Sequence, residues 1–186
     1  MSPRNWLVRA ILLAAYGCNG DIAGAIAVPK VHRTLASTCP AQRAVGSLIT
    51  NPQTWDQCSQ DADCVDGTNG RCLWFKRGDC SYDTCFSDSD CSNAGVCECR
   101  SSEADNAANF CVTGNCRVDS DCGPANFCSP SVVKSICGHD ASTGFGYFCH
   151  TSRDSCVDDS DCGAFEICAY NLPGRRWTCI TQSVCF

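Results

Sequence analysis

Hydrophobic residues in this chain occur in short groups. The one continuous apolar run near a terminus lies close to the N-terminus. The run from Ala10 to Tyr16 follows Arg4 and Arg9, which is the shape of a secretory signal. It is too short to span a bilayer, which needs about 20 apolar residues. No later segment approaches that length, so the sequence predicts residues 1–17 as a signal peptide and no transmembrane helix.

Further along the chain, apolar residues flank glycine- and proline-containing turns. In the stretch "CAYNLPGRRWTC", Tyr170 and Trp177 lie on either side of Pro173-Gly174, a pattern typical of a β-hairpin in which the two aromatics pair. The stretch "GHDASTGFGYFC", with Gly144 and Gly146, can form a β-hairpin in the same way. Aspartate is far more frequent than glutamate, and aspartate favours turns over helix interiors. We therefore expect hairpins and short helical turns, with no long helices.

Cysteine is the most informative residue type, with 21 copies among 186 residues. That density indicates a disulfide scaffold in an oxidising compartment. The formal net charge is −6, and an acidic chain has no electrostatic reason to bind nucleic acid.

Two processing sites are compatible with the signal. Gly17-Cys18 follows the apolar run directly and resembles a bacterial lipobox, in which Cys18 takes the lipid and becomes the N-terminus. The alternative is cleavage after Ala27 in the small-x-small stretch Ala25 to Ala27. Either way 20 cysteines remain, an even number that fits ten disulfides.

From Cys58 the chain repeats a motif of the form C-x-x-D-[AS]-D-C. Each repeat adds a third cysteine, a variable loop and a fourth cysteine, which defines units 1 to 4 as residues 58–84, 85–115, 116–155 and 156–186. Their cysteine sets are Cys58, Cys64, Cys72 and Cys80; Cys85, Cys91, Cys97 and Cys111; Cys116, Cys122, Cys128 and Cys149; Cys156, Cys162, Cys168 and Cys179.

The remaining cysteines are Cys39, Cys99, Cys137 and Cys185. If each unit closes internally, Cys99 and Cys137 are insertions in adjacent units. We expect a Cys99–Cys137 cross-link and, by elimination, Cys39–Cys185, although sequence does not fix connectivity. Residues 18–57 read as a tether or loosely packed lead-in whose apolar patch, Ala44 to Ile49, can dock on the body.

Units of about 30 residues are too small for a hydrophobic core to stabilise them alone. In the chain-entropy model a disulfide that closes a loop of about 15 residues contributes about 3 kcal/mol. The expected fold class is therefore small and disulfide-rich: four tandem cysteine-stapled units with short β-hairpins and helical turns, and little regular secondary structure.

The paired aspartates allow a structural and a metal-binding interpretation. In the structural one, Asp159 caps a short helical turn and Asp161 lies in its first turn. In the other, the pair supplies carboxylate oxygens to calcium, although the ligand series of an EF-hand is absent. Zinc at Cys97-x-Cys99, or at Cys137-Gly-His139, is weaker because paired C-x2-C spacing is missing. We expect no metal and no cofactor.

Catalytic motifs are absent from the sequence. The histidines are His32, His139 and His150, and no nucleophile elbow, zinc-protease helix, nucleotide loop or C-x-x-C pair occurs. His150 is expected to be an exposed loop residue. The chain is predicted not to be an enzyme.

The repeats resemble the Dickkopf N-terminal type of cysteine-rich repeat, with "CRVDSDCGPANFC" (Cys116 to Cys128) as the best match. Such repeats also look like those of predicted bacterial lipoproteins, which agrees with Cys18. The resemblance covers roughly residues 58–185 and implies a scaffold, not a particular ligand. Signalling antagonism is not implied, because the second cysteine-rich domain it depends on is not visible here.

These observations favour an extracytoplasmic protein, lipid-anchored to a bacterial membrane or otherwise secreted. It would serve as a structural or protein-interaction scaffold for an unknown protein or surface ligand. The alternative is a secreted serine-protease inhibitor that inserts a basic hairpin tip, Leu172 to Trp177, into a trypsin-like enzyme.

Overall fold

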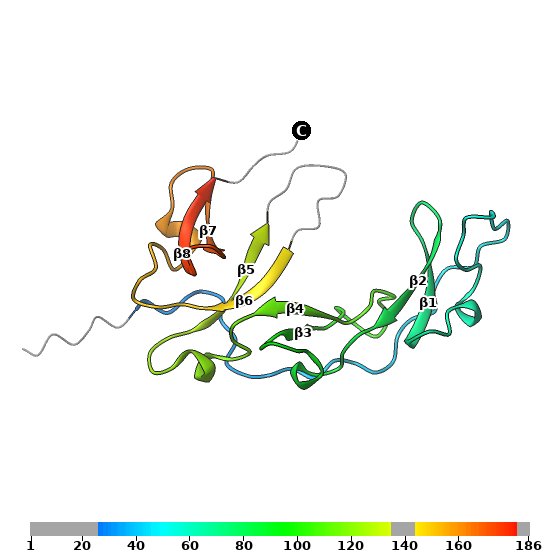
Figure 1. Ribbon diagram of the computed structural model, residues 1–186, viewed down its shortest axis with the longest axis horizontal. Coiled ribbons are helices and arrows are strands. Elements are labelled where there is room, and N and C mark those ends of the chain that lie inside the picture. Colours follow the sequence, from blue (N-terminus) through cyan, green and yellow to red (C-terminus); the bar gives the residue numbers. More distant parts are fainter. Residues whose placement is uncertain (1–25, 135–143, 182–186) are drawn as a thin grey trace, which may run out of the picture.

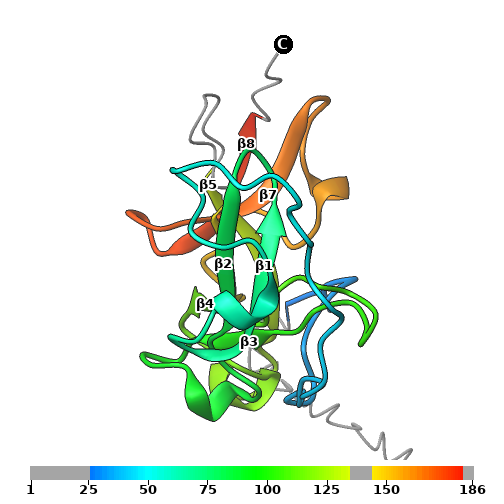
Figure 2. The ribbon, with the colours of Figure 1, turned by 90° about the vertical axis from the view of Figure 1, so that its right-hand side faces the viewer.

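The computed structural model describes residues 26–134 and 144–181. The described chain forms a row of four small units, with unit 4 at one end and unit 1 at the other (Figure 1). Figure 2 looks along the row from the unit 1 end, where the hairpin of that unit is nearest the viewer. The fold is small and disulfide-rich, as the sequence predicts.

Each unit consists of one 3-10 turn followed by an antiparallel strand pair. The turns are η1 (Asp61–Asp63), η2 (Asp88–Asp90), η3 (Asp119–Cys122) and η4 (Asp159–Asp161). The strand pairs are β1 (Thr68–Trp74) with β2 (Gly78–Asp83), β3 (Val96–Glu98) with β4 (Phe110–Gly114), β5 (Cys128–Lys134) with β6 (Gly144–Cys149), and β7 (Glu166–Asn171) with β8 (Arg176–Thr181). The prediction that the variable loops form hairpins is confirmed for the described residues, including the pairing of Tyr170 with Trp177.

The cysteines explain why the same unit forms four times. The third and fourth cysteines of each unit are opposite each other in the strand pair, as Cys168 and Cys179 are in unit 4. The first cysteine bonds to the third and the second to the fourth, so both strands are tied to the turn that precedes them. The eight bonds are Cys58–Cys72, Cys64–Cys80, Cys85–Cys97, Cys91–Cys111, Cys116–Cys128, Cys122–Cys149, Cys156–Cys168 and Cys162–Cys179.

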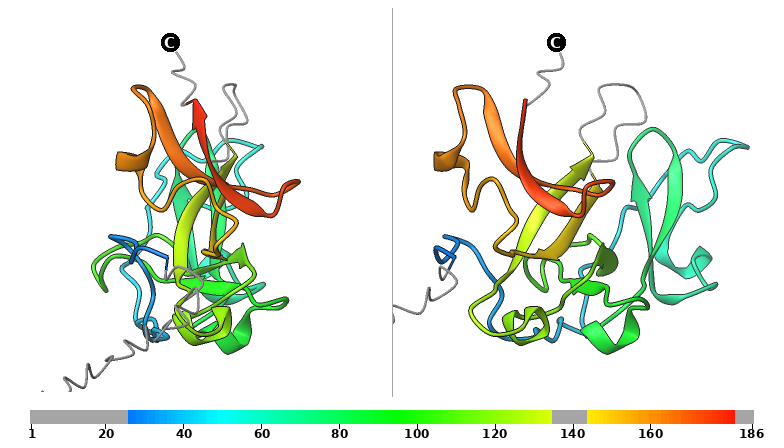
Figure 3. Two further views of the ribbon diagram at one scale, coloured as in Figure 1. Left: turned by 90° about the vertical axis from the view of Figure 1, so that its left-hand side faces the viewer. Right: turned by 60° about the vertical axis from the view of Figure 1, so that its left-hand side comes forward.

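Units 2 and 3 share a sheet, because β4 pairs with β6 in parallel to give the order β3-β4-β6-β5. The approach of these strands requires a glycine at position 146, where a Cβ atom would lie 2.5 Å from the carbonyl oxygen of Thr113. Unit 4 packs against unit 3 (Figure 3), with Phe148 stacked on Tyr170 at 4.0 Å between ring centroids.

The segment before Cys58 is not a loosely packed tether over its described part. It runs beside the row from unit 4 to unit 1, in the direction opposite to the order of the units (Figure 1). Lys30 binds unit 4, Arg33 exchanges backbone hydrogen bonds with unit 3, Thr38 bridges Ser87 of unit 2, and Ser47 donates to Cys72 of unit 1. Its apolar patch docks as expected through Ile49, which packs on the buried cysteines of unit 1.

The buried core is divided among small clusters made largely of disulfide sulfur, with Trp177, Tyr170 and Phe148 between units 3 and 4. The described residues include no helix with the length and apolar character needed to cross a bilayer.

Candidate functional site

The first aspartate of every repeat binds the hairpin that follows it. Its Oδ1 accepts the backbone N–H of the third cysteine of the unit, nine to eleven residues ahead, at 2.8–3.0 Å. The pairs are Asp61 with Cys72, Asp88 with Cys97, Asp119 with Cys128 and Asp159 with Cys168. These bonds hold the turn and hairpin together at the position where the first disulfide also joins them.

The second aspartate binds backward instead. Its Oδ2 accepts two consecutive backbone N–H groups just before the turn, as Asp161 does from Val157 at 2.8 Å and Asp158 at 3.1 Å. The same geometry occurs at positions 63, 90 and 121. Because these bonds favour the ionised carboxylate, they lower the pKa of Asp161 below its ordinary value, and the same cause acts on Asp63 and Asp90.

The structural interpretation of the aspartate pairs therefore holds, but the assigned role of Asp159 was wrong. Asp159 is the first residue of η4 rather than its cap, and its carboxylate binds forward to Cys168. A cap was expected because the nearest donors in sequence belong to the turn, whereas folding brings a more distant N–H into reach.

The geometry disfavours calcium at the aspartate pairs and zinc at Cys97-x-Cys99. The acids of one pair bind donors on opposite sides of the turn, and the described carboxylates form no cluster of three potential metal ligands. The clusters that do meet that criterion consist of cysteines already in disulfides. Cys97 and Cys99 cannot form a zinc pair because they are bonded to Cys85 and Cys39. Cys137 and His139 lie outside the described residues.

The prediction of a disulfide between adjacent units, Cys99–Cys137, is also wrong. Cys99 bonds to Cys39 of the lead-in, and this excludes both Cys99–Cys137 and Cys39–Cys185. The prediction left Cys39 to pair with Cys185 because it did not place the lead-in next to unit 2. In the structure Cys39 lies beside that unit, and its N–H binds the carbonyl of Phe86. Cys18, Cys137 and Cys185 lie outside the described residues.

Basic residues of the lead-in bind the first aspartates of units 2 and 3 through the carboxylate oxygen that does not contact the third cysteine, Oδ2. Arg33 donates to Asp88 at 2.6 and 3.2 Å, and its guanidinium lies 5.5 Å from the ring centroid of Tyr147. His32 Nδ1 lies 2.7 Å from Asp119 Oδ2. These contacts were not predicted, although a segment with clustered basic residues before an aspartate-rich repeat was a usable signal.

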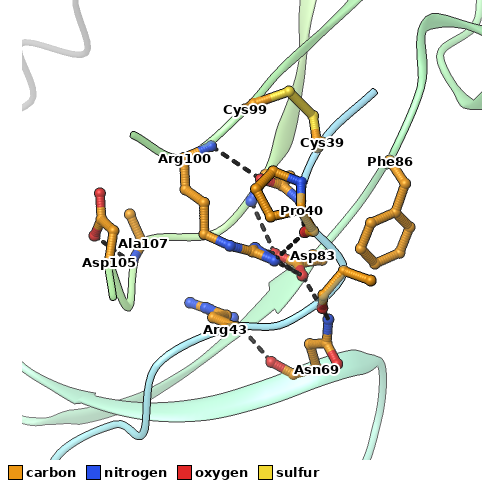
Figure 4. A network of polar contacts seen from close by, with 12 residues as sticks. Cys39, Pro40, Arg43, Asn69, Asp83, Phe86, Cys99, Arg100, Asp105 and Ala107 are labelled. Atoms are coloured by element: carbon orange, nitrogen blue, oxygen red, sulfur yellow. Dashed lines mark hydrogen bonds and ion pairs between the residues drawn. A yellow bond between two sulfur atoms is a disulfide. The ribbon is translucent and has the colours of Figure 1, made fainter. Parts of the chain in front are cut away.

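A buried ion pair joins units 1 and 2 to the lead-in (Figure 4). Asp83 and Arg100 have fully buried side chains and make a bidentate contact at 2.9–3.0 Å. Asp83 also accepts the N–H of Asn109 at 2.8 Å, and Arg100 donates to the carbonyl of Pro40 in the lead-in at 2.6 Å. The pair is thus fully hydrogen-bonded, which is the condition for a buried charge to be tolerated.

His150 is buried, contrary to the expectation of an exposed loop residue. Only 1 % of its surface is exposed, and it stacks on Trp177 with ring centroids 4.0 Å apart. Its Nδ1 lies 3.2 Å from Asp154 Oδ2. The backbone turns from β6 toward unit 4 at this residue, and the imidazole fills the junction between the two units.

Two hairpin tips carry large exposed side chains. Trp74 and Phe75 are 53 % and 86 % exposed at the β1–β2 turn. At the β7–β8 turn Leu172 is 50 % exposed, and Arg175 is exposed with a φ of 48°.

Comparison with known proteins assigns no family, since no family model, curated protein or solved structure matches the chain.

Proposed function

We propose that the chain is a non-enzymatic, lipid-anchored extracytoplasmic scaffold that binds another protein or a surface ligand. The observation that carries the proposal is the lead-in, which is bonded in turn to all four units and tied to unit 2 by Cys39–Cys99. A row held in this way is a stiff support, because each unit is bonded internally and also to the same lead-in segment.

The disulfides favour an extracellular location for the module. Nine are present among the described residues, and such bonds persist in oxidising compartments. The similarity of the four motifs to Dickkopf N-terminal-type repeats, including those of predicted bacterial lipoproteins, agrees with this role.

The exposed aromatic side chains support a binding role for the tips. Phe75 gains little from burial because it remains largely in water, and Trp74 leaves about half of its surface exposed. Tryptophan is enriched among the residues that dominate binding interfaces. A tip of this kind on a rigid support loses little conformational entropy when a partner covers it.

A lipid at Cys18 would keep the row close to the membrane. Eight peptide units separate Cys18 from residue 26, which even when fully extended span at most about 29 Å. Lys30, only four residues further on, is bonded to Asp158. Unit 4 would therefore be the unit nearest the bilayer.

Intact-mass analysis of the membrane fraction tests the anchor. We expect a chain that begins at a diacylated Cys18, and we expect the Cys18→Ala variant to leave the membrane fraction. A mature chain that starts at Val28 without lipid would refute the anchor and leave a secreted scaffold.

Protease inhibition is the alternative function, and exposure of Arg175 and Arg176 at the β7–β8 tip is the observation that favours it. The left-handed backbone of Arg175 argues against it, because proteases bind substrate-like segments in extended form. A trypsin inhibition assay with the purified chain separates the two, and stoichiometric inhibition lost in Arg175→Ala would favour the inhibitor.

A further inference from the structure

The lining of a cavity between units 3 and 4 includes two side chains with polar atoms that have no hydrogen-bond partner among the described residues. It has a volume of about 290 Å³, and its lining includes Ser129, His150, Asp158, Asp159 and Trp177 together with Lys30 of the lead-in. That volume is close to the lower end of known ligand pockets and suits one amino acid side chain.

Two of the lining side chains have buried polar atoms with no hydrogen-bond partner among the described residues, namely Ser129 Oγ and His150 Nε2. Ser129 is opposite Phe148 in the β5–β6 pair, and His150 follows Phe148 by two positions. His150 lies just beyond the end of β6 at Cys149, and both residues line the same cavity. Buried polar atoms in native proteins are normally satisfied, so two orphans at one cavity call for an explanation.

The hydrogen-bond chemistry of His150 is set by Asp154. A carboxylate accepts hydrogen bonds, so the proton must be on Nδ1 of His150, 3.2 Å from Asp154 Oδ2. In the neutral imidazole Nε2 is then an acceptor, as Ser129 Oγ also can be. Two acceptors at one cavity fit a ligand that donates hydrogen bonds.

Asp159 adds a negative charge at the same cavity. In units 1 to 3 the first aspartate binds the third cysteine through Oδ1, while Oδ2 binds the lead-in through Gly46, Arg33 or His32. Asp159 Oδ1 binds Cys168 in the usual way, but no described residue donates to Oδ2. Lys30 instead donates through its backbone N–H to Asp158 and through Nζ to Ser160.

We infer that this cavity binds a cationic side chain, specifically the guanidinium of an arginine presented by a partner polypeptide. The inference rests on the proposed interaction role and names the chemistry of the partner. The molecule already contains the matching contact, since Arg33 fills the corresponding position of unit 2 with two hydrogen bonds to Asp88. In unit 4 the Oδ2 of Asp159 is the accessible acceptor, and a guanidinium that enters the cavity deeply would also reach the buried Ser129 Oγ and His150 Nε2.

The test is a titration of the purified full chain, with its disulfides formed, against N-acetyl-arginine methylamide. The imidazole nitrogens of His150 and the indole N–H of Trp177 are followed by NMR. We expect a saturable shift of these signals with a dissociation constant in the millimolar range. The neutral citrulline analogue, which has nearly the same shape, should bind at least tenfold more weakly.

Variants separate binding from folding. Asp159→Asn keeps the acceptor for Cys168 and removes the charge, so it should weaken binding at least tenfold while the spectrum stays folded. Ser129→Ala removes a hydroxyl that has no hydrogen-bond partner among the described residues, and it should weaken binding about threefold. Asp66→Asn, which removes an exposed charge elsewhere, is the matched control and should change affinity by less than twofold.

Three outcomes would overturn the inference. They are no saturable shift in the folded chain, equal binding of the citrulline analogue, and a shift of the same signals by calcium chloride alone that is lost in Asp159→Asn. Because the titration does not depend on the lipid, its failure would leave the anchoring result at Cys18 unaffected, and failure of the anchor would leave the titration interpretable.

Discussion

Replacing Arg100 by methionine should be among the most destabilising single changes outside the cysteines. The substitution keeps most of the apolar stem but removes three contacts to Asp83 and one each to the carbonyls of Pro40 and Gln42. Asp83 would keep only the N–H of Asn109 and the side-chain amide of Asn69. Breaking a fully buried pair in this way costs about 3–5 kcal/mol, because it leaves an uncompensated charge.

The control is an ion pair of the same residue types at the surface. Arg77 and Asp79 lie 2.8 Å apart, but their side chains are 51 % and 43 % exposed, and such pairs contribute about 0–1 kcal/mol. Arg77→Met should therefore change the free energy of unfolding by less than about 1 kcal/mol. Comparing the two variants isolates the effect of burial.

The assay is urea unfolding with the disulfides intact, combined with hydrogen exchange at the N–H of Asn109, which binds Asp83. Arg100→Met should shift the unfolding curve and speed exchange at Asn109. Adding Asp83→Asn should restore part of the loss, because the carboxylate left without Arg100 is then neutral, while the neighbouring Arg43 keeps its hydrogen bonds to carbonyl groups and to Ser81. If Arg100→Met costs no more than Arg77→Met, the view that this pair joins units 1 and 2 is refuted.

Three other predictions concern the repeats and the lead-in. Asp159→Asn should leave stability nearly unchanged because the amide oxygen can still accept from Cys168, whereas Asp159→Ala should cost about 0.5–1.5 kcal/mol in urea unfolding. Because the folded pKa values of Asp161, Asp63 and Asp90 lie below the unfolded value, the contribution of these carboxylates to stability is complete above about pH 4 and is lost as pH falls through the folded pKa. Melting temperatures should drop below that pH, and less steeply in Asp161→Asn. Non-reducing peptide mapping should recover Cys39 linked to Cys99, and finding Cys39 bonded elsewhere would contradict the path of the lead-in.

The repeated unit was predictable because its determinants are local. The third and fourth cysteines flank a turn-forming loop, so they end up opposite each other in a hairpin whatever the loop length. Tyr170 and Trp177 were expected to pair for the same reason, and they do. The intervals between cysteines therefore carried most of the information on the fold class.

The lead-in was not predictable from the same signals because its contacts span long sequence separations. Lys30 binds a residue 128 positions later, and Arg33 binds one 55 positions later. Nothing in a local pattern indicates which of several aspartates such a residue will reach. His150 was misjudged for a similar reason, since its burial depends on Trp177 of the next unit.

The path of the lead-in explains why unit 4 differs from the other three. The segment meets unit 4 first and binds it through the backbone and side chain of Lys30, which donate to Asp158 and Ser160 and not to Asp159 Oδ2. Its later residues fill the corresponding oxygens of units 3, 2 and 1. Both oxygens of the first aspartate are thus bonded within the molecule in units 1 to 3, whereas in unit 4 Oδ1 is bonded to Cys168 and Oδ2 has no donor among the described residues. With a lipid on Cys18, that unit would be the one nearest the membrane, so the cavity would meet partners close to the bilayer surface.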